Sequence, residues 1–288
     1  MPFAELSAVK HRLQLGVPLP FNVRDADRTL LLARGFTIAS AEQLEALLNR
    51  GALVDMAELM TVSDQIRQAP RQQLPRLWQV ATSQLNRTLL LAGSADSTSF
   101  RQALGDASAP LQALVERDPD LAIFQVLRQD GNADADYGAG RSLQTAVTSL
   151  LVAQRLGWES DESERAFKVA LTMNLSMLEL QGQMARQALP PTPQQRVDLQ
   201  THPMRSVRLL EAAGISDPLW LRAVLEHHEN ETGSGYPSGS NQPCELASLV
   251  RRSDVYTSKL AFRSSRDALA ADLAGRQMFM QEIGRAHV

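Results

Sequence analysis

The most informative stretch of the sequence is HHENETGSGYP, residues 227–237. Upstream of it, Trp220, Val224 and His227 recur at the spacing of one helical face, so the two adjacent histidines are expected to end a helix. The glycines and the proline that follow favour an irregular loop. Because the C-terminal end of a helix carries a partial negative charge, a cation is stabilised there, and the histidine pair is a candidate for metal binding.

A third histidine, His202, is expected to lie beside this pair. The dipeptide His202-Pro203 is interpreted as the start of a helix, and residues 214–218 are expected to reverse the chain into the helix that ends at His227. Each arm has about ten residues with a rise of ~1.5 Å, so the hairpin returns the chain to its starting level. Taken alone, His202 needs no role beyond a helix start, but three converging imidazoles form a suitable metal cluster.

Asp254 is the remaining candidate ligand. It falls on an expected helix that carries Leu246 and Val250 on its apolar face. Arg263 and Arg266 follow it, spaced as two cations one turn apart that can bind phosphate oxygens. Isolated residues of these types are most often solvated, so it is the order His, His-His-Glu, Gly-Tyr-Pro, Asp, Arg that makes them candidates.

In this order of motifs, residues 137–282 resemble an HD-GYP domain. The resemblance implies an all-α fold of the HD phosphohydrolase superfamily, whose active members hydrolyse cyclic di-GMP with two or three iron or manganese ions. Residues 227–237 match the family's signature, except that Thr232 stands where an aspartate is usual. The implied metal ligands are His202, His227, His228 and Asp254, and the implied phosphate or nucleotide contacts are Arg263 and Tyr236.

The signature loop also has an implied partner. In the family this loop is thought to dock on diguanylate cyclase domains, so a domain of that kind or another signalling protein is an expected partner. The loop residues concerned are Gly233, Gly235, Tyr236 and Pro237.

The first half of the resemblance departs from the family pattern. Met173, Asn174 and Met177 occupy the places of a histidine, an aspartate and a lysine, and Tyr137 occupies the place of a glutamate ligand. The asparagine has no charge with which to bridge two cations. A thioether suits iron or manganese poorly, so the ordinary role of Met173 is core packing.

Arg141 stands where some family members have a histidine ligand. Two unit charges ~4 Å apart interact by roughly 4 kcal/mol at an effective dielectric of 20, so an inward guanidinium would repel a divalent ion by about 8 kcal/mol. We hypothesise that Arg141 replaces a lost cation and holds a phosphate without activating water. The alternative is a solvated residue at a helix start.

Three functions remain open from the sequence. The first is a degenerate HD-GYP module that binds cyclic di-GMP or a protein partner, with weak or no phosphodiesterase activity. The second is an active phosphodiesterase that works with a reduced metal site, and the third is a scaffold that binds proteins but no nucleotide. The expected cofactor is accordingly one divalent ion, iron or manganese, or none.

The fold class is expected to be mainly α, with an all-α HD-type domain preceded by helices and a small N-terminal α/β unit. The expected segments are an α/β unit at 1–60, a helical connector at 61–131 and the HD-GYP-like domain at 132–282. Strands are expected at 21–24, 29–33 and 35–38, with a turn at 25–28 between the first two. Ser40 is expected to cap a helix through Gln43, and Asp118-Pro119 to begin another.

Composition excludes several classes of function. With 29 Lys and Arg against 32 Asp and Glu, the net charge of −3 provides no basic field for nucleic acid and no polybasic stripe for a membrane. No apolar run approaches the ~20 residues that span a bilayer, and no signal peptide is recognisable. The single cysteine fits a reducing compartment, so the chain is expected to be cytoplasmic.

The final residues, 283–288, need separate treatment. Their sequence IGRAHV is what a common sequencing-adapter read gives when it is translated. They are therefore interpreted as a foreign tail, and His287 is not counted as a candidate ligand. The natural chain is expected to continue past this point.

Overall fold

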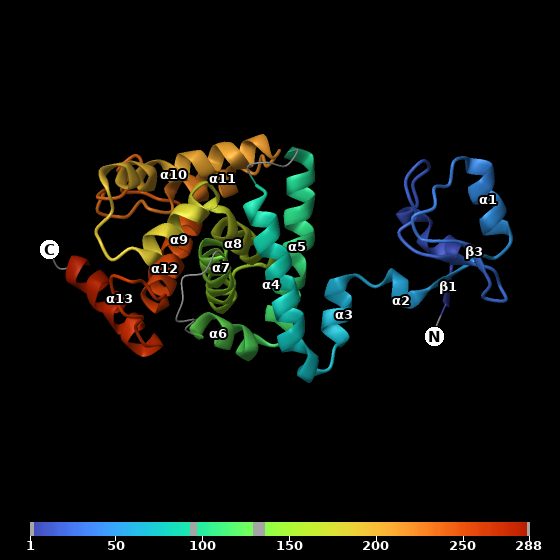
Figure 1. Ribbon diagram of the computed structural model, residues 1–288, viewed down its shortest axis with the longest axis horizontal. Helices are drawn as coiled ribbons and strands as arrows, with labels where there is room; N and C mark the ends of the chain where they lie inside the picture. The colour runs from blue at the N-terminus through green and yellow to red at the C-terminus, as the bar shows by residue number, and fades with distance from the viewer. Residues whose placement is uncertain (1–2, 93–96, 129–135, 287–288) are drawn as a thin grey trace. The chain divides into compact units, whose positions relative to one another are not determined.

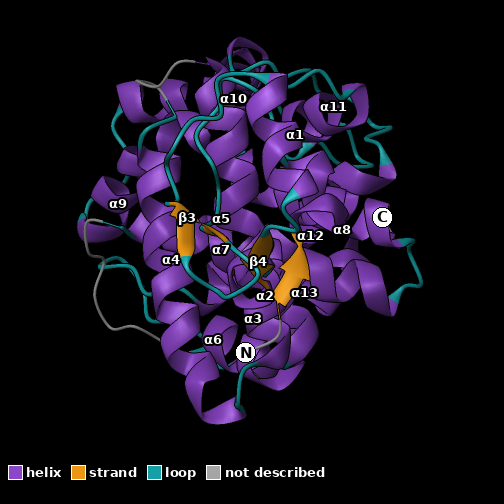
Figure 2. Cartoon of the chain, turned by 90° about the vertical axis from the view of Figure 1, so that its right-hand side faces the viewer, coloured by secondary structure: helices purple, strands orange, loops and turns teal. Residues whose placement is uncertain are grey.

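The computed structural model describes residues 3–92, 97–128 and 136–286 (Figure 1). Contacts divide the chain into two compact units, Met1–Gln68 and Ala69–Val288. Residues 131–135 of the expected domain boundary and 287–288 of the suspected foreign tail lie outside the described residues. The described residues are mainly helical, with strands in the first unit, which is the expected fold class (Figure 2). None of the described helices is long and apolar enough to cross a membrane.

The first unit combines a small sheet with short helices. Its elements are β1 (Phe3–Glu5), η1 (Leu6–Arg12), β2 (Val23–Arg24), β3 (Leu30–Leu32), α1 (Ala41–Asn49), β4 (Leu53–Asp55), α2 (Met56–Leu59) and α3 (Val62–Gln68). All neighbours in the sheet are antiparallel, in the order β1-β4-β2-β3. Val23 pairs with Val54 at its centre, and both are fully buried with Leu6 and Phe21 in the core of this unit.

Local signals predicted part of this unit. Ser40 caps α1 by accepting a hydrogen bond from the Gln43 amide, as expected. The strand expected at 35–38 is wrong, because Thr37 forms only an isolated bridge with Pro18, and a proline has no N–H with which to extend a ladder. The strands β1 and β4, of three residues each, were not predicted from the sequence.

The second unit is a helical bundle. Its elements are η2 (Arg71–Gln73), α4 (Leu74–Leu90), α5 (Ser97–Arg117), α6 (Pro119–Leu127), α7 (Tyr137–Arg155), α8 (Ser160–Thr172), η3 (Leu175–Met177), α9 (Leu178–Arg186), α10 (Pro193–Ala212), α11 (Pro218–Glu226), α12 (Glu245–Leu260) and α13 (Ala271–Ala286). Helix α7 packs against α4, α6, α8, α9 and α12 and lies at the centre of the unit (Figure 1). It is largely buried, and it therefore carries the side chains nearest to the middle of the bundle.

Two of the predicted helix boundaries in this unit are confirmed, and two predicted helical placements are wrong. Asp118 caps α6 and His227 caps the end of α11, as expected. The helix start assigned to His202-Pro203 is wrong: α10 begins at Pro193, where Thr192 and Gln195 form a capping box. The expectation that Arg263 and Arg266 lie one turn apart on a helix is also wrong. Helix α12 ends at Leu260, and the backbones of the two arginines pair with each other in a tight turn.

The close packing of α7 on α9 gives a testable prediction. A Cβ at Gly138 would lie 2.2 Å from the carbonyl oxygen of Leu178, whereas a Cβ at Gly140, on the same helix, would meet nothing within 4 Å. We expect Gly138→Ala to lower the free energy of unfolding by about 1–3 kcal/mol, because one of the two helices must shift. Gly140→Ala should raise it by roughly 0.5–1 kcal/mol. Urea unfolding followed by circular dichroism measures both, and equal effects would contradict the packing described.

Candidate metal centre and adjoining pocket

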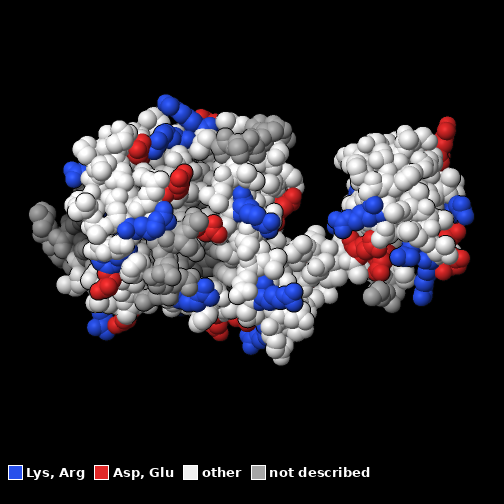
Figure 3. Space-filling model, in the orientation of Figure 1, with Lys and Arg blue, Asp and Glu red and all other residues white. Residues whose placement is uncertain are grey.

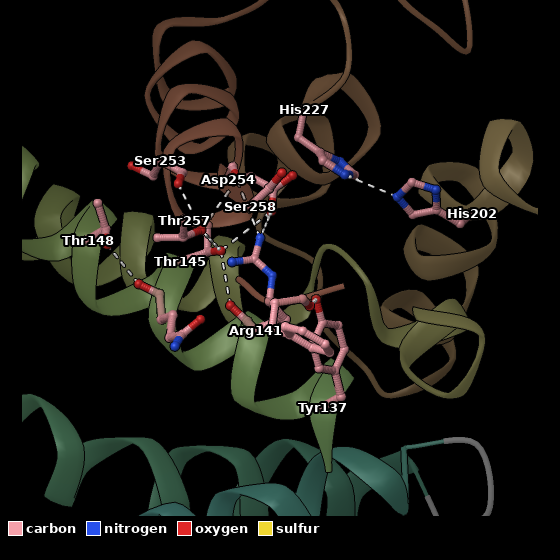
Figure 4. Close-up of polar contacts among 12 residues, drawn as sticks. Tyr137, Arg141, Thr145, Thr148, His202, His227, Ser253, Asp254, Thr257 and Ser258 are labelled. Atoms are coloured by element: carbon pink, nitrogen blue, oxygen red, sulfur yellow. Dashed lines mark hydrogen bonds and ion pairs between the residues drawn. The ribbon is translucent and has the colours of Figure 1, made fainter. Parts of the chain in front are cut away.

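Three histidines from two neighbouring helices converge in the second unit. His202 lies within α10, His227 caps α11 and His228 follows it in the loop. Among the described residues, their ligand atoms lie within 4.8 Å of one another and form the one group of this kind. His202 and His227 are fully buried, with their Nε2 atoms 3.1 Å apart (Figure 4). The convergence expected from the sequence is therefore present, although His202 reaches it from mid-helix.

Backbone carbonyl groups fix the ring orientation of both buried histidines. The Nδ1 atom of His202 lies 2.6 Å from the Leu199 carbonyl oxygen, and that of His227 lies 2.7 Å from the Val224 carbonyl oxygen. Since a carbonyl oxygen can only accept, both Nδ1 atoms donate, and in the neutral rings each Nε2 atom carries a lone pair. The Val224 carbonyl is available because α11 ends within a turn of it.

Burial keeps the three imidazoles neutral. It lowers the pKa of His202 to about 3, and the nearby His227 contributes in the same direction. Burial also lowers the pKa of His227 and that of His228. Two neutral rings whose Nε2 lone pairs face each other at 3.1 Å repel unless an electrophile lies between them. This donor set, in which carbonyl groups hold the Nδ1–H of His202 and that of His227, fits a divalent metal ion.

The loop after His228 is folded back onto this centre. Tyr236 stacks on the ring of His228, with centroids 4.5 Å apart. The buried Glu229 carboxylate accepts hydrogen bonds from the amides of Ser238 and Gly239, at 2.6 and 3.1 Å, and so closes the loop. A Cβ at Gly235 would lie 2.3 Å from the His228 carbonyl oxygen, which explains the glycine at this position of the motif.

Asp254 does not belong to this group of three histidines and is paired with an arginine. Its Oδ1 atom accepts a hydrogen bond from Arg141 Nη2 at 3.2 Å, and the Asp254 carbonyl oxygen is 3.4 Å from the same nitrogen (Figure 4). The two side chains are 6% and 19% exposed, respectively. The alternative of a solvated Arg141 at a helix start is therefore wrong: the guanidinium points inward and balances the charge of Asp254.

The two terminal nitrogens of Arg141 differ in their contacts. No hydrogen bond is found for the buried Nη1 atom among the residues that the structure describes. Burial lowers the pKa of Arg141, and the charge of Asp254 opposes this effect. Because a guanidinium nevertheless stays protonated, Nη1 is a charged donor that still requires an acceptor.

A pocket of about 450 Å³ adjoins the histidines and brings together most of the remaining candidates. The predicted residues that line it are Tyr137, Arg141, Met177, His228, Tyr236, Asp254 and Arg263. Sequence reasoning missed its other wall, which includes Gln181, Met184 and residues 187–191. These residues come from α9 and the loop after it, and neither segment carries a motif.

The degenerate positions of the resemblance are buried. Met173 is fully buried, which confirms that it packs in the core, and Asn174 is 2% exposed. No hydrogen-bond partner is found for Asn174 Oδ1 in the described part of the chain. Asn174 directly precedes η3, which packs against α10, the helix of His202.

Comparisons with known proteins agree with this arrangement. No protein-family model matches the chain, and no curated protein sequence matches it. Its structure is similar to that of Bd1817, described as a HDG"Y"P protein from Bdellovibrio bacteriovorus. The TM-score is 0.62 at 15% sequence identity, and the match covers 98% of this chain and 94% of the other. The likeness shows that the chain has an HD-GYP-like fold.

The ion pair between α7 and α12 gives a second prediction. We expect Asp254→Ala to lower the free energy of unfolding by about 3–5 kcal/mol, because it leaves the buried Arg141 guanidinium without a counter-charge. Glu231→Ala is the matched control, since Glu231 pairs with Arg252 at the surface. Removing an exposed pair of that kind should cost at most about 1 kcal/mol. Chemical unfolding compares the two variants, and a loss no larger for Asp254→Ala than for the control would refute a structural role of the pair.

Proposed function

We propose that the second unit is an HD-GYP-like module with weak or no phosphodiesterase activity. It holds one divalent ion at His202, His227 and His228 and binds a phosphate-bearing nucleotide in the adjoining pocket, with cyclic di-GMP as the expected ligand. The observation that carries this proposal is the buried ion pair of Arg141 and Asp254. It places a fixed positive charge at a position where the resemblance implies metal ligands.

Arg141 is the proposed stand-in for a lost metal ion. Its Nη2 atom is bound to Asp254, while its Nη1 atom has no partner among the described residues, and the residue lines the pocket together with Arg263. A phosphate oxygen would supply the missing acceptor, and the planar guanidinium suits such an anion. The two arginines provide charge and orientation for a phosphate without needing a second metal ion.

The same arginine explains why weak catalysis is expected. An unpaired guanidinium ~4 Å from a divalent ion would repel it by about 8 kcal/mol at an effective dielectric of 20. The pairing with Asp254 offsets part of this repulsion, but it also engages the carboxylate that could have held the ion. Asn174 and the buried Met173 provide no anionic bridge in compensation. A bound iron or manganese ion would polarise a phosphoryl oxygen or lower the pKa of a water. The chain's own residues hold the ion and orient the phosphate, but they supply little further charge for a leaving oxygen.

Nucleotide binding gives a third prediction. We expect Arg141→Ala to weaken cyclic di-GMP binding by about 10-fold or more, because a charge-assisted hydrogen bond contributes roughly 1.5–3 kcal/mol. Isothermal titration calorimetry measures the affinity. Arg222→Ala is the control, since Arg222 pairs with Glu226 on α11 and does not line the pocket. Unchanged affinity in Arg141→Ala would remove the phosphate role, and no binding by the wild type would favour a protein-binding scaffold.

Metal content and turnover give a fourth prediction. We expect the purified protein to bind about one divalent ion per chain, and His202→Ala and His227→Ala to lose it, because they remove two of its three imidazole ligands. Metal analysis and a cyclic di-GMP hydrolysis assay measure the two properties. Near-stoichiometric metal with substantial turnover that His228→Ala abolishes would establish the alternative, an active phosphodiesterase with a reduced metal site.

The signature loop is the proposed docking site for a protein partner. Ser234 and Pro237 are exposed, while Tyr236 is half-buried against His228. On the face of the molecule drawn in Figure 3, Lys and Arg side chains are intermixed with Asp and Glu side chains, so charge of one sign does not mark a docking surface on that face. A diguanylate cyclase domain or another signalling protein remains the expected partner, and it would contact a loop whose position depends on Glu229.

A further inference from the structure

Pro203 occupies an unusual position within α10. It is buried in the interior of the helix, directly after His202. A proline there has no N–H for the helical hydrogen bond, and its ring presses on the carbonyl group four residues earlier. Because an amide at position i donates to the carbonyl at i−4, the acceptor left without its partner is that of Leu199.

That carbonyl group has another donor. The Nδ1–H of His202 binds the Leu199 oxygen at 2.6 Å. In helices, side chains point back towards the N-terminus, which places the imidazole of His202 over the preceding turn. The proline thus removes the backbone donor at the point where the neighbouring side chain supplies one.

This exchange sets the chemistry of the opposite ring nitrogen. With the proton held on Nδ1, the Nε2 atom of His202 presents its lone pair to His227 Nε2, 3.1 Å away. If the Leu199 carbonyl also accepted a backbone amide, the imidazole would share that oxygen, its hydrogen bond would weaken and the Nε2–H tautomer would become more accessible.

We propose that Pro203 is a positioning residue: by freeing the Leu199 carbonyl, it fixes the Nδ1–H tautomer of His202 and aims Nε2 at the metal centre. The effect on metal binding rests on the proposed function. The effect on the tautomer does not, because it is a property of the metal-free protein.

The first experiment measures the tautomer without metal. Long-range ¹H–¹⁵N correlation spectra of the full-length protein report which ring nitrogen of His202 carries the proton. We expect the Nδ1–H form in the wild type and a substantial population of the Nε2–H form in Pro203→Ala. Pro110→Ala is the matched control, since Pro110 is a buried proline inside α5, which contains no histidine. A pure Nδ1–H form retained in Pro203→Ala would overturn the proposal.

The second experiment measures metal affinity by competition with a chelator, with manganese as the probe. We expect Pro203→Ala to weaken binding by ~10–100-fold, which is typical for loss of a group that orients a ligand. The unfolding midpoint of Pro203→Ala should not fall, because the variant regains a helical hydrogen bond. Pro110→Ala should leave the affinity unchanged. Equal affinity in wild type and Pro203→Ala would overturn the metal part, whereas absence of metal binding by the wild type would instead refute the proposed function.

Discussion

The buried ion pair between Arg141 and Asp254 joins the central helix α7 to α12, and both residues line the pocket beside it. A carboxylate and a guanidinium removed from water stabilise a structure only while both are present, since either one alone is an uncompensated buried charge. In this pair, one oxygen of Asp254 accepts a hydrogen bond from Arg141. Asp254 is the only carboxylate among the ligands that the sequence resemblance implied. Among the described residues, the three imidazoles are the ligand atoms that lie within 4.8 Å of one another.

The three imidazoles and the ion pair form two neighbouring regions that favour ligands of opposite charge. His202 and His227 are fully buried and neutral, and they can accept a cation. Arg141 lines the pocket that His228 also lines, its buried Nη1 has no hydrogen-bond partner among the described residues, and its charge favours an anion. Because the two sites favour opposite charges, a metal ion and a phosphate group bound together would attract each other. In the described part of the chain, a second metal ion would have no anionic site of its own here.

The sequence predicted those features that depend on local signals. The end of α11 at His227, the cap at Asp118 and the close approach of His202 to His227 follow from helical periodicity and turn chemistry. The Arg141–Asp254 pair could not be derived from local signals, because it joins residues far apart in sequence; only the family resemblance, which put both residues at metal-ligand positions, indicated that they lie near each other. The pocket wall at residues 187–191 was missed for a related reason, since irregular segments carry no period.

The wrong start assigned to α10 is informative about the site itself. A proline normally marks the first turn of a helix, and Thr192-Pro193 carries that signal correctly. Pro203 breaks the rule in the interior, beside the one histidine whose ring nitrogen binds the freed carbonyl. Local rules fail most often where a functional arrangement opposes the regular backbone. Replacing this proline would restore a helical hydrogen bond, so its place in the helix is explained by the proposed role in orienting His202 and not by helix stability.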